Sequence, residues 1–436
     1  MLAEDPNKKN IPSGPEQQFD LHTTEESFGK VAELISQYGD ICSFPSSSRR
    51  SSSYLINHPD YIKHVLVKNN ANYSKGVGFE RVKLLLGNGI IVSDGPFWRR
   101  QRRMVQPGFS RQTIMELTAV MVDCNQQLMS EWRQKAKTEE VINLTETASE
   151  LALTVVLRTI FGADLQRMEA TAGENPFGIL TEDSVRDMQL VLKYRGLMKL
   201  VQEVIDHRRE NVIERNDFLG AFMAAKDKET GETMTDKEMI DEVMTLIVAG
   251  HETTACTLNW VWYLLSQHPE AEQQVQHEAD QFSIENLGME SFARLAYSRQ
   301  VVEEALRLYP PVWLFTRKAI NADKLGDYDV PAGTDIFIAP YFLHRHPEFW
   351  DEPEKFKPER FSDEAVKSRD KNAFIPFSAG PRRCIGDFFA TIEMQLHLGM
   401  LAREFRLVHV PDKPLELIPD VNLRTKHNIL MKVVSR

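Results

Sequence analysis

The feature that most constrains how this chain folds is one long, largely apolar helical segment, residues 236–266. It is preceded by Thr235-Asp-Lys-Glu238, which has the residue types of an N-terminal capping box. From Thr245 to Trp262 the segment is largely apolar. A helix of that kind must be buried. The segment therefore predicts a long buried helix.

The rest of the chain predicts a mainly α fold with a small β portion. Further helical periodicity covers 112–161, 297–309 and 384–405, and Pro310-Pro311 ends the second of these. A polar stretch, 343–378, is expected to be irregular. Strand signals are read at 54–57, 316–319, 328–330 and 335–339. No repeat or linker divides the chain, so we expect a loosely ordered segment, 1–25, and a single domain, 26–436.

The composition excludes several classes of protein. A formal net charge of −11 argues against nucleic acid as a partner. The four cysteines are scattered and predict neither a disulfide framework nor a zinc site. The first residues are too polar for a signal peptide, and no run of 18 apolar residues occurs. We therefore expect a cytoplasmic protein without a membrane span.

The segment Phe377-Ser-Ala-Gly-Pro-Arg-Arg-Cys-Ile-Gly386 carries the chemistry. A thiolate at Cys384 needs positive potential and backbone N–H donors, which two arginines and a helix N-terminus supply. Gly380 and Gly386 let the backbone approach a flat ligand closely. The plain alternative is that Cys384 is a buried, inert cysteine.

This segment resembles the haem-binding loop of the cytochrome P-450 family, Phe-x-x-Gly-x-Arg-x-Cys-x-Gly, and every fixed position is present. The resemblance implies the cytochrome P-450 fold and haem b (iron protoporphyrin IX) as cofactor. It makes Cys384 the axial iron ligand and a catalytic residue. Arg382 would then pair with a haem propionate, and Phe377 would pack beneath the cofactor with Gly380 and Gly386 in the loop.

A second motif lies in the apolar helix, where Ala249-Gly-His-Glu-Thr253 interrupts the pattern. A glycine and an acid inside a buried helix oppose local propensity and burial, and such conflicts tend to mark function. The alternative is a kinked helix with satisfied polar groups. The sequence matches the family's oxygen-activation motif, Ala-Gly-x-Glu-Thr. By that resemblance Ala249 and Gly250 face the cofactor, Glu252 and Thr253 are catalytic, and His251 is a bystander.

Three more positions resemble family positions near the haem. Trp98 and Arg102 are four residues apart on one expected helix and match Trp-x-x-x-Arg, a propionate-binding motif. Arg317 resembles a further propionate partner because it follows the expected helix 297–309, which carries the family's Glu-x-x-Arg motif at Glu304 and Arg307. Taken alone, the first two make an ordinary basic patch with an incidental aromatic residue. The family's structural ionic network would comprise Glu304, Arg307 and Arg360.

The resemblance implies a monooxygenase that inserts one atom of dioxygen into a hydrophobic small molecule: a lipid, a terpenoid or a natural-product intermediate. No flavin or iron–sulfur segment is visible, so electrons would come from a separate ferredoxin or flavodoxin and its NAD(P)H reductase. We expect these partners to dock on a basic set and the protein to be a monomer. The docking set comprises Arg99, Arg100, Arg102, Arg103 and Arg383. The alternatives are a peroxide-driven peroxygenase, an isomerase on the same fold, and a non-enzymatic haem-thiolate sensor.

Two regions bear on the substrate. In the family, the segments around Ile90-Ile91 and after the Glu-x-x-Arg helix face the pocket, although both could equally be core. The residues from these segments expected to line the pocket are Ile90, Ile91, Val312, Trp313, Leu314 and Phe315. The stretch 168–182 is loop-like, which predicts a reduced or mobile lid.

Overall fold

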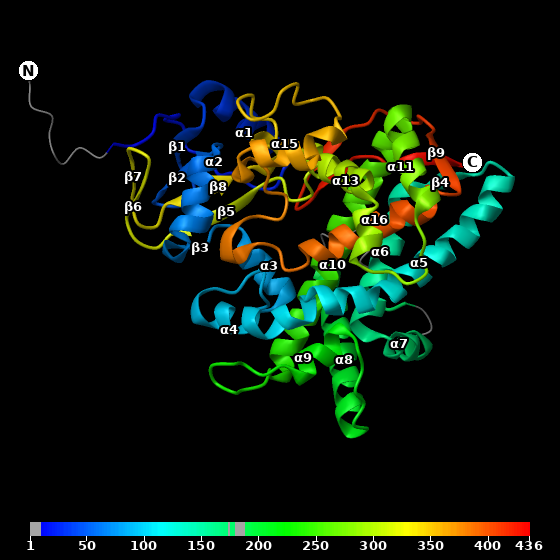
Figure 1. Cartoon of the computed structure of the whole chain (residues 1–436). Helices are drawn as coiled ribbons and strands as arrows, with labels where there is room; N and C mark the ends of the chain where they lie inside the picture. The colour runs from blue at the N-terminus through cyan, green and yellow to red at the C-terminus, as the bar shows by residue number, and fades with distance from the viewer. Residues whose placement is uncertain (1–9, 173–174, 179–187) are drawn as a thin grey trace, which may run out of the picture. The chain divides into compact units, whose positions relative to one another are not determined.

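The computed structural model of the chain describes residues 10–172, 175–178 and 188–436 (Figure 1). Its internal contacts divide the chain into two units. Unit 1 comprises Met1–Glu80, Leu306–Cys384 and Leu417–Arg424. Unit 2 comprises Arg81–Ala305, Ile385–Glu416 and Thr425–Arg436. Each unit is described by itself.

Unit 1 is built on a five-stranded sheet with the order β1-β2-β8-β5-β3. The pair β2–β8 is parallel and the other pairs are antiparallel. All four residues of β8 are buried, as expected for a strand covered on both faces. The strands are β1 (Ile41–Pro45), β2 (Ser52–Ile56), β3 (Tyr73–Lys75), β5 (Phe315–Ala319) and β8 (Asp335–Ile338), with two small pairs, β6 (Asp323–Leu325) with β7 (Tyr328–Val330) and β10 (Leu417–Pro419) with β11 (Leu423–Thr425).

Short helices accompany this sheet. A π-helical turn, η1 (His64–Lys68), follows α2 and contacts the turn η7 (Gly380–Arg382). The α-helices are α1 (Glu25–Tyr38), α2 (Pro59–Lys63), α14 (Pro340–Leu343) and α15 (Asp363–Ser368), and α13 (Ala296–Leu308) runs across the division between the units.

The N-terminal segment is more ordered than the sequence predicted. Residues 1–9 lie outside the described residues, but parts of 10–24 lie alongside β1 and bond to it. Ser43 N–H donates to the Ser13 carbonyl at 3.1 Å, and the Phe19 ring stacks on Phe44 with centroids 4.7 Å apart. Leu21 is buried. These apolar anchors outweigh the polar character of the segment.

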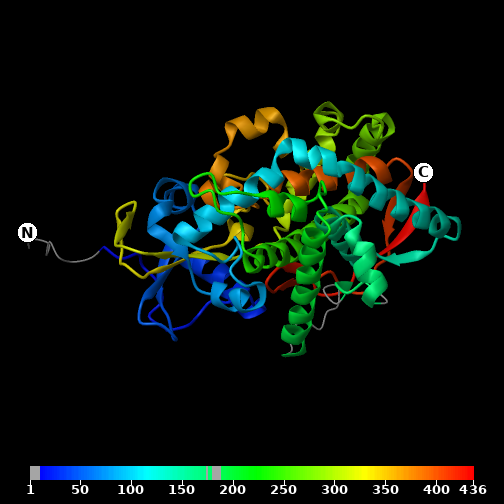
Figure 2. The same cartoon turned by 90° about the horizontal axis from the view of Figure 1, so that it is seen from below.

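Unit 2 is mainly helical. Its core pairs α10 with α6, and α5 packs on both α6 and α16. Its three-stranded sheet has the order β4-β12-β9 and lies beside the C-terminus (Figure 2). The helices are α3 (Phe79–Leu86), α4 (Gly95–Val105), α5 (Arg111–Lys137), α6 (Leu144–Phe161), α7 (Asp164–Ala172), α8 (Met188–Glu210), α9 (Phe218–Ala224), α10 (Asp236–Gln267), α11 (Pro269–Gln281), α12 (Met289–Ala293) and α16 (Asp387–Leu401), and the strands are β4 (Val141–Asn143), β9 (Phe405–His409) and β12 (Leu430–Ser435).

The long buried helix is confirmed. Thr235 accepts from the Glu238 backbone N–H, and the Glu238 carboxylate accepts from the Thr235 N–H, which completes the predicted capping box. The predicted strand 328–330 is β7. Within the described residues, no helix is both long and apolar enough to cross a membrane.

Three predicted boundaries were wrong. The segment 112–161 is two helices, because Glu139 takes a left-handed φ of 52° and β4 follows it. The last helix begins at Asp387 with Gly386 as its N-cap and ends at Leu401, so Phe405 belongs to β9. The stretch 343–378 is partly helical, because Ser362 caps α15 through the Ala365 N–H.

Candidate active site

Cys384 differs from the other cysteines in its exposure. Cys42, Cys124 and Cys256 are buried, whereas Cys384 is exposed. Burial raises the pKa of the Cys42 and Cys124 thiols to about 11, so neither is a thiolate at neutral pH. Cys384 is therefore the cysteine whose surroundings suit a ligand.

The loop before Cys384 is a closed turn. The Cys384 backbone N–H donates to the Phe377 carbonyl at 2.9 Å, and Phe377 itself is half-buried. Gly380 has a φ of 68°, which a residue with a side chain adopts only at a cost. A Cβ at Gly380 would also lie 1.9 Å from the Leu66 carbonyl oxygen in η1. Glycine is required here for both reasons, and the loop is seated directly on η1.

The chain enters a helix just after Cys384. Gly386 is the N-cap of α16, whose axis starts at Asp387. The thiol thus precedes the positive end of a 15-residue helix, which favours a negative charge. Arg382 is half-buried and Arg383 is exposed, and both add positive potential. A helix N-terminus and nearby arginines are surroundings of the kind that stabilise a cysteine thiolate.

In unit 2, the middle part of α10 has one face that is accessible to solvent. Leu246, Ala249, Gly250 and Thr253 follow the i, i+3, i+4, i+7 spacing of one helix face and are all half-buried, whereas most of the neighbouring helix is buried. The Thr253 hydroxyl donates to the Ala249 carbonyl at 2.7 Å. The sequence-predicted motif therefore lies on an accessible face inside a buried helix.

The acid of this motif is also accessible. Glu252 is half-buried, next to Thr253 in the chain. Its charge acts on Tyr194 of α8, whose pKa rises to about 12 mainly because the phenol is buried and also because Glu252 is near. His251 points into α6, where its Nε2 lies 2.8 Å from the Ser149 hydroxyl. His251 is thus held by α6, in line with the bystander role expected for it.

Gly250 lies where α10 packs against α6. A Cβ at Gly250 would meet Cγ2 of Val156, in α6, at 2.9 Å. The missing side chain therefore accommodates the packing of α10 against α6. The role of Gly250 at a cofactor stays a prediction.

Trp98 and Arg102 both lie on α4 and are both half-buried, as their four-residue spacing predicted. Arg102 Nε donates to Gln106 Oε1 at 3.4 Å. In unit 1, Arg317 of β5 is buried, and its Nη1 donates to the Thr316 carbonyl at 2.8 Å. The roles of these three residues at a cofactor remain predictions.

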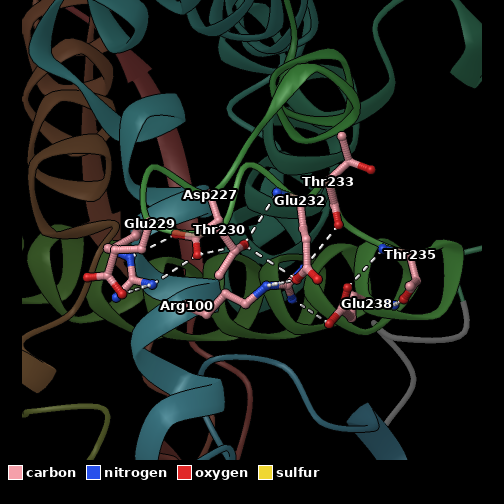
Figure 3. A network of polar contacts seen from close by, with 9 residues as sticks. Arg100, Asp227, Glu229, Thr230, Glu232, Thr233, Thr235 and Glu238 are labelled. Atoms are coloured by element: carbon pink, nitrogen blue, oxygen red, sulfur yellow. Dashed lines mark hydrogen bonds and ion pairs between the residues drawn. The ribbon is translucent and has the colours of Figure 1, made fainter.

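Two members of the predicted basic docking set, Arg100 and Arg103, form ion pairs with acidic residues of this chain (Figure 3). Arg103 forms ion pairs with Asp227 at 2.9 Å and with Glu229 at 2.9 Å. The Arg103 hydrogen bonds lower the pKa of Asp227 to about 2. Arg100 Nη1 binds Glu238 Oε1 at 2.7 Å. Acidic residues of the segment between α9 and α10, together with Glu238 in the first turn of α10, thus hold α4 through these ion pairs.

Part of the expected pocket lining is core. Trp313 has no exposed surface, its indole N–H donates to the Asp420 carbonyl at 2.9 Å, and it packs with Leu314 among buried apolar residues of unit 1. A side chain without exposed surface lines no accessible cavity. Val312 and Phe315 are half-buried. For Trp313 the alternative left open by the sequence, that it is core, therefore holds, whereas the pocket role of Leu314 stays a prediction.

The segment around Ile90 is anchored by two acids that the sequence analysis passed over. Ile90 is buried and Ile91 is half-buried. The Ile90 N–H donates to Glu242 at 3.0 Å, and the Asn88 N–H donates to Asp241 at 2.9 Å. Burial raises the pKa of Glu242 to about 8. The sequence signal for this contact was the pair of acidic residues, Asp241 and Glu242, inside an apolar helix.

The expected structural network is buried at α13. Glu304 and Arg307 have no exposed surface. Arg307 donates to the carbonyls of His344, Pro353 and Lys355 at 2.7–3.1 Å. The ionic trio with Arg360 remains a prediction. The lid prediction falls partly on residues 173–174 and 179–187, outside the described residues, whereas the part before Ala172 belongs to α7 and is helical.

The cytochrome P-450 family model matches residues 17–175 and 175–433, nearly the whole chain. The chain belongs to the cytochrome P-450 family. It is a haem-thiolate monooxygenase, and it acts with dioxygen, an organic substrate and a redox partner, as members of this family do.

Three of the named relatives that this cytochrome P-450 resembles come from Streptomyces. It is 34% identical to Cyclooctatin synthase of Streptomyces melanosporofaciens over 85% of this chain and 84% of that protein. It is 34% identical to Cyclooctat-9-en-7-ol 5-monooxygenase of the same species over 84% of this chain and 82% of that protein. It is 28% identical to Pentalenene oxygenase of Streptomyces avermitilis over 92% of each chain.

The residues of this cytochrome P-450 fit a haem. Unit 1 offers an exposed thiol on a loop whose glycine is required by its backbone, next to a helix N-terminus and two arginines. Unit 2 offers an accessible face of small and apolar residues that ends in an alcohol. A soft thiolate donor is the ligand type that haem iron takes in monooxygenases.

Proposed function

We propose that this cytochrome P-450 hydroxylates a hydrophobic terpenoid in natural-product biosynthesis. The observation that carries the proposal is the accessible face of α10, where Leu246, Ala249 and Gly250 are apolar and Thr253 brings a hydroxyl. The names of two relatives, which refer to cyclooctat-9-en-7-ol and pentalenene, support a terpenoid.

For the cofactor we propose haem b (iron protoporphyrin IX), with Cys384 as its ligand. When bound, thiolate-ligated haem activates dioxygen for insertion of one oxygen atom into a C–H bond. The loop holds the Cys384 thiol outward, while α16 and the neighbouring arginines keep it deprotonated. The further proposed cofactor contacts are Trp98, Arg102, Ala249, Gly250, Arg317, Phe377, Gly380, Arg382 and Gly386.

Thr253 and Glu252 are proposed to move protons. The Thr253 hydroxyl is on the accessible face of α10, and its oxygen can accept a hydrogen bond while it donates to Ala249. Glu252 is half-buried and can exchange protons with water. An alcohol and an acid adjacent in the chain form a short relay between solvent and that face.

For electron supply we propose a separate ferredoxin or flavodoxin with an NAD(P)H reductase. Arg99, Arg102 and Arg383 remain the candidates for docking an acidic partner, and Arg99 and Arg383 are exposed. The neutralised Arg100 and Arg103 are left out. We further propose a cytoplasmic monomer in which residues 26–436 act as one catalytic domain, which is supported by the family match over nearly the whole chain.

The test is product formation from terpenes and terpene alcohols under three conditions: with a ferredoxin and reductase, with peroxide alone, and with neither. We expect hydroxylated product with the reductase chain. Equal turnover with peroxide alone would instead indicate a peroxygenase. An isomerised product without electrons would indicate an isomerase, and no product with any compound would favour a sensor.

Two variants in α10 sharpen this test. Thr253→Ala should lower product per electron consumed by about tenfold or more, because it removes the proposed proton carrier. Thr257→Ala is the matched control, since its hydroxyl makes the same bond to the residue four before it, at 2.8 Å, but is buried. Equal losses in both variants would contradict the relay.

A further inference from the structure

The position of Cys384 depends on the turn that precedes it. The Cys384 N–H donates to the Phe377 carbonyl at 2.9 Å, and the Ser378 N–H donates to the Ile375 carbonyl at 3.0 Å. Ser378 is held at a φ of 59°, a left-handed conformation that is rare for serine. A displacement of Ile375 would therefore shift the turn 375–378, to which the Cys384 backbone is hydrogen-bonded.

Ile375 is held by a buried histidine. Its backbone N–H donates to His344 Nε2 at 2.9 Å, and His344 has no exposed surface. Since Nε2 accepts a hydrogen bond, the ring is neutral and its proton is on Nδ1. Burial and the charges of Arg307 and Arg345 hold the pKa of His344 well below its usual range, which keeps this acceptor available at neutral pH.

The other side of His344 is fixed to α13. Arg307 Nη1 donates to the His344 carbonyl at 3.0 Å, and the Arg307 guanidinium lies over the ring of Trp350 at 5.1 Å. Phe374 packs on the His344 ring at 5.1 Å between centroids. Hydrogen bonds and covalent links thus run without a gap from Arg307 through His344 and Ile375 to the cysteine turn.

We propose that His344 is a positioning residue for the haem ligand, which holds the turn 375–378 and so sets where the Cys384 thiol lies. The inference rests on the proposed ligation of haem by Cys384. Loss of the acceptor would leave the Ile375 N–H buried without a partner, and the turn would move to satisfy it.

Two substitutions separate the hydrogen bond from simple packing. In His344→Gln the side-chain oxygen can take the place of Nε2, whereas His344→Asn keeps a carboxamide that is too short to reach Ile375. Trp313→Phe is the matched control, because it also removes one buried hydrogen bond in unit 1, but this bond goes to Asp420 and not to the cysteine turn.

The measurement is the spectrum of the reduced carbon monoxide complex of each holoenzyme, with its reduction potential and its urea unfolding midpoint. We expect His344→Asn to show about tenfold more protein without the red-shifted Soret band than wild type. The glutamine variant and Trp313→Phe should resemble wild type in their spectra, even where the midpoint falls.

Equal spectra for the glutamine and asparagine variants would overturn the inference, as would the same loss in Trp313→Phe. Failure of the underlying function is distinguishable from this, because wild-type protein would then lack the red-shifted band itself.

Discussion

Replacing Gly250 with alanine tests how α10 and α6 pack. The new methyl group would lie 2.9 Å from Cγ2 of Val156, where carbon atoms prefer about 3.5–4.0 Å. Val156 is buried, and its β-branched side chain has one strongly preferred rotamer in a helix, so it has no inexpensive way to turn aside. The strain must be relieved by moving one helix.

The expected free-energy change follows from two opposing effects. Alanine is favoured over glycine inside a helix by about 1 kcal/mol, whereas overpacking a core costs about 1–3 kcal/mol. Gly250→Ala should therefore lower the unfolding free energy by up to about 2 kcal/mol. In a Val156→Ala background the clash is absent, and the same change should raise the unfolding free energy by about 1 kcal/mol.

The assay is urea unfolding of wild type, both single variants and the double variant, followed by circular dichroism. The double-mutant cycle should give a coupling energy of about 1–3 kcal/mol. If Gly250→Ala has the same effect in both backgrounds, the idea that this glycine serves the packing of α10 against α6 is refuted.

Three further outcomes are expected. Gly380→Ala should lower the unfolding free energy by about 2 kcal/mol or more, because of its positive φ and the 1.9 Å approach to a carbonyl; an unchanged urea midpoint would contradict this. Arg208→Gln leaves the buried Asp217 without its ion pair and leaves Asp164 with Arg215 alone, and it should cost about 3–5 kcal/mol. The adjacent control Arg209→Gln loses an exposed pair and should cost below about 1 kcal/mol in the same assay. Burial raises the pKa of Glu393 well above its usual range, so the folded state keeps a proton that the unfolded state releases above about pH 4.3. The unfolding free energy should then fall as pH rises, by up to about 1.4 kcal/mol per pH unit, until the pKa of Glu393 in the folded state is reached. Glu393→Gln should remove this contribution to the slope of unfolding free energy against pH, measured between pH 6 and 8.

Local signals were enough where neighbouring residues decide the outcome. The capping box at Thr235 and Glu238 formed as predicted, since both partners lie within one turn. The cysteine loop was also predicted, because its glycines and arginines are contiguous. The start of the last helix was misplaced by three residues, because Gly386 caps α16 and the residues before it form the turn.

Distant partners could not be predicted from local patterns. Arg103 and Asp227 are 124 residues apart, and no periodicity links them, so the arginines of α4 looked like a free basic surface. Trp313 was read as a possible pocket residue because its burial depends on distant partners, the Phe28 ring of α1 at 5.1 Å and the Asp420 carbonyl. Such long-range contacts decide which charges are neutralised and which side chains are core.

The most direct test of the account is the carbon monoxide difference spectrum of the reduced, haem-loaded protein, compared with Cys384→Ser. We predict a strongly red-shifted Soret band in wild type and its loss in the serine variant, because serine supplies no thiolate. A folded, haem-replete wild type without that band, or a serine variant that keeps it, would show that Cys384 is not the ligand.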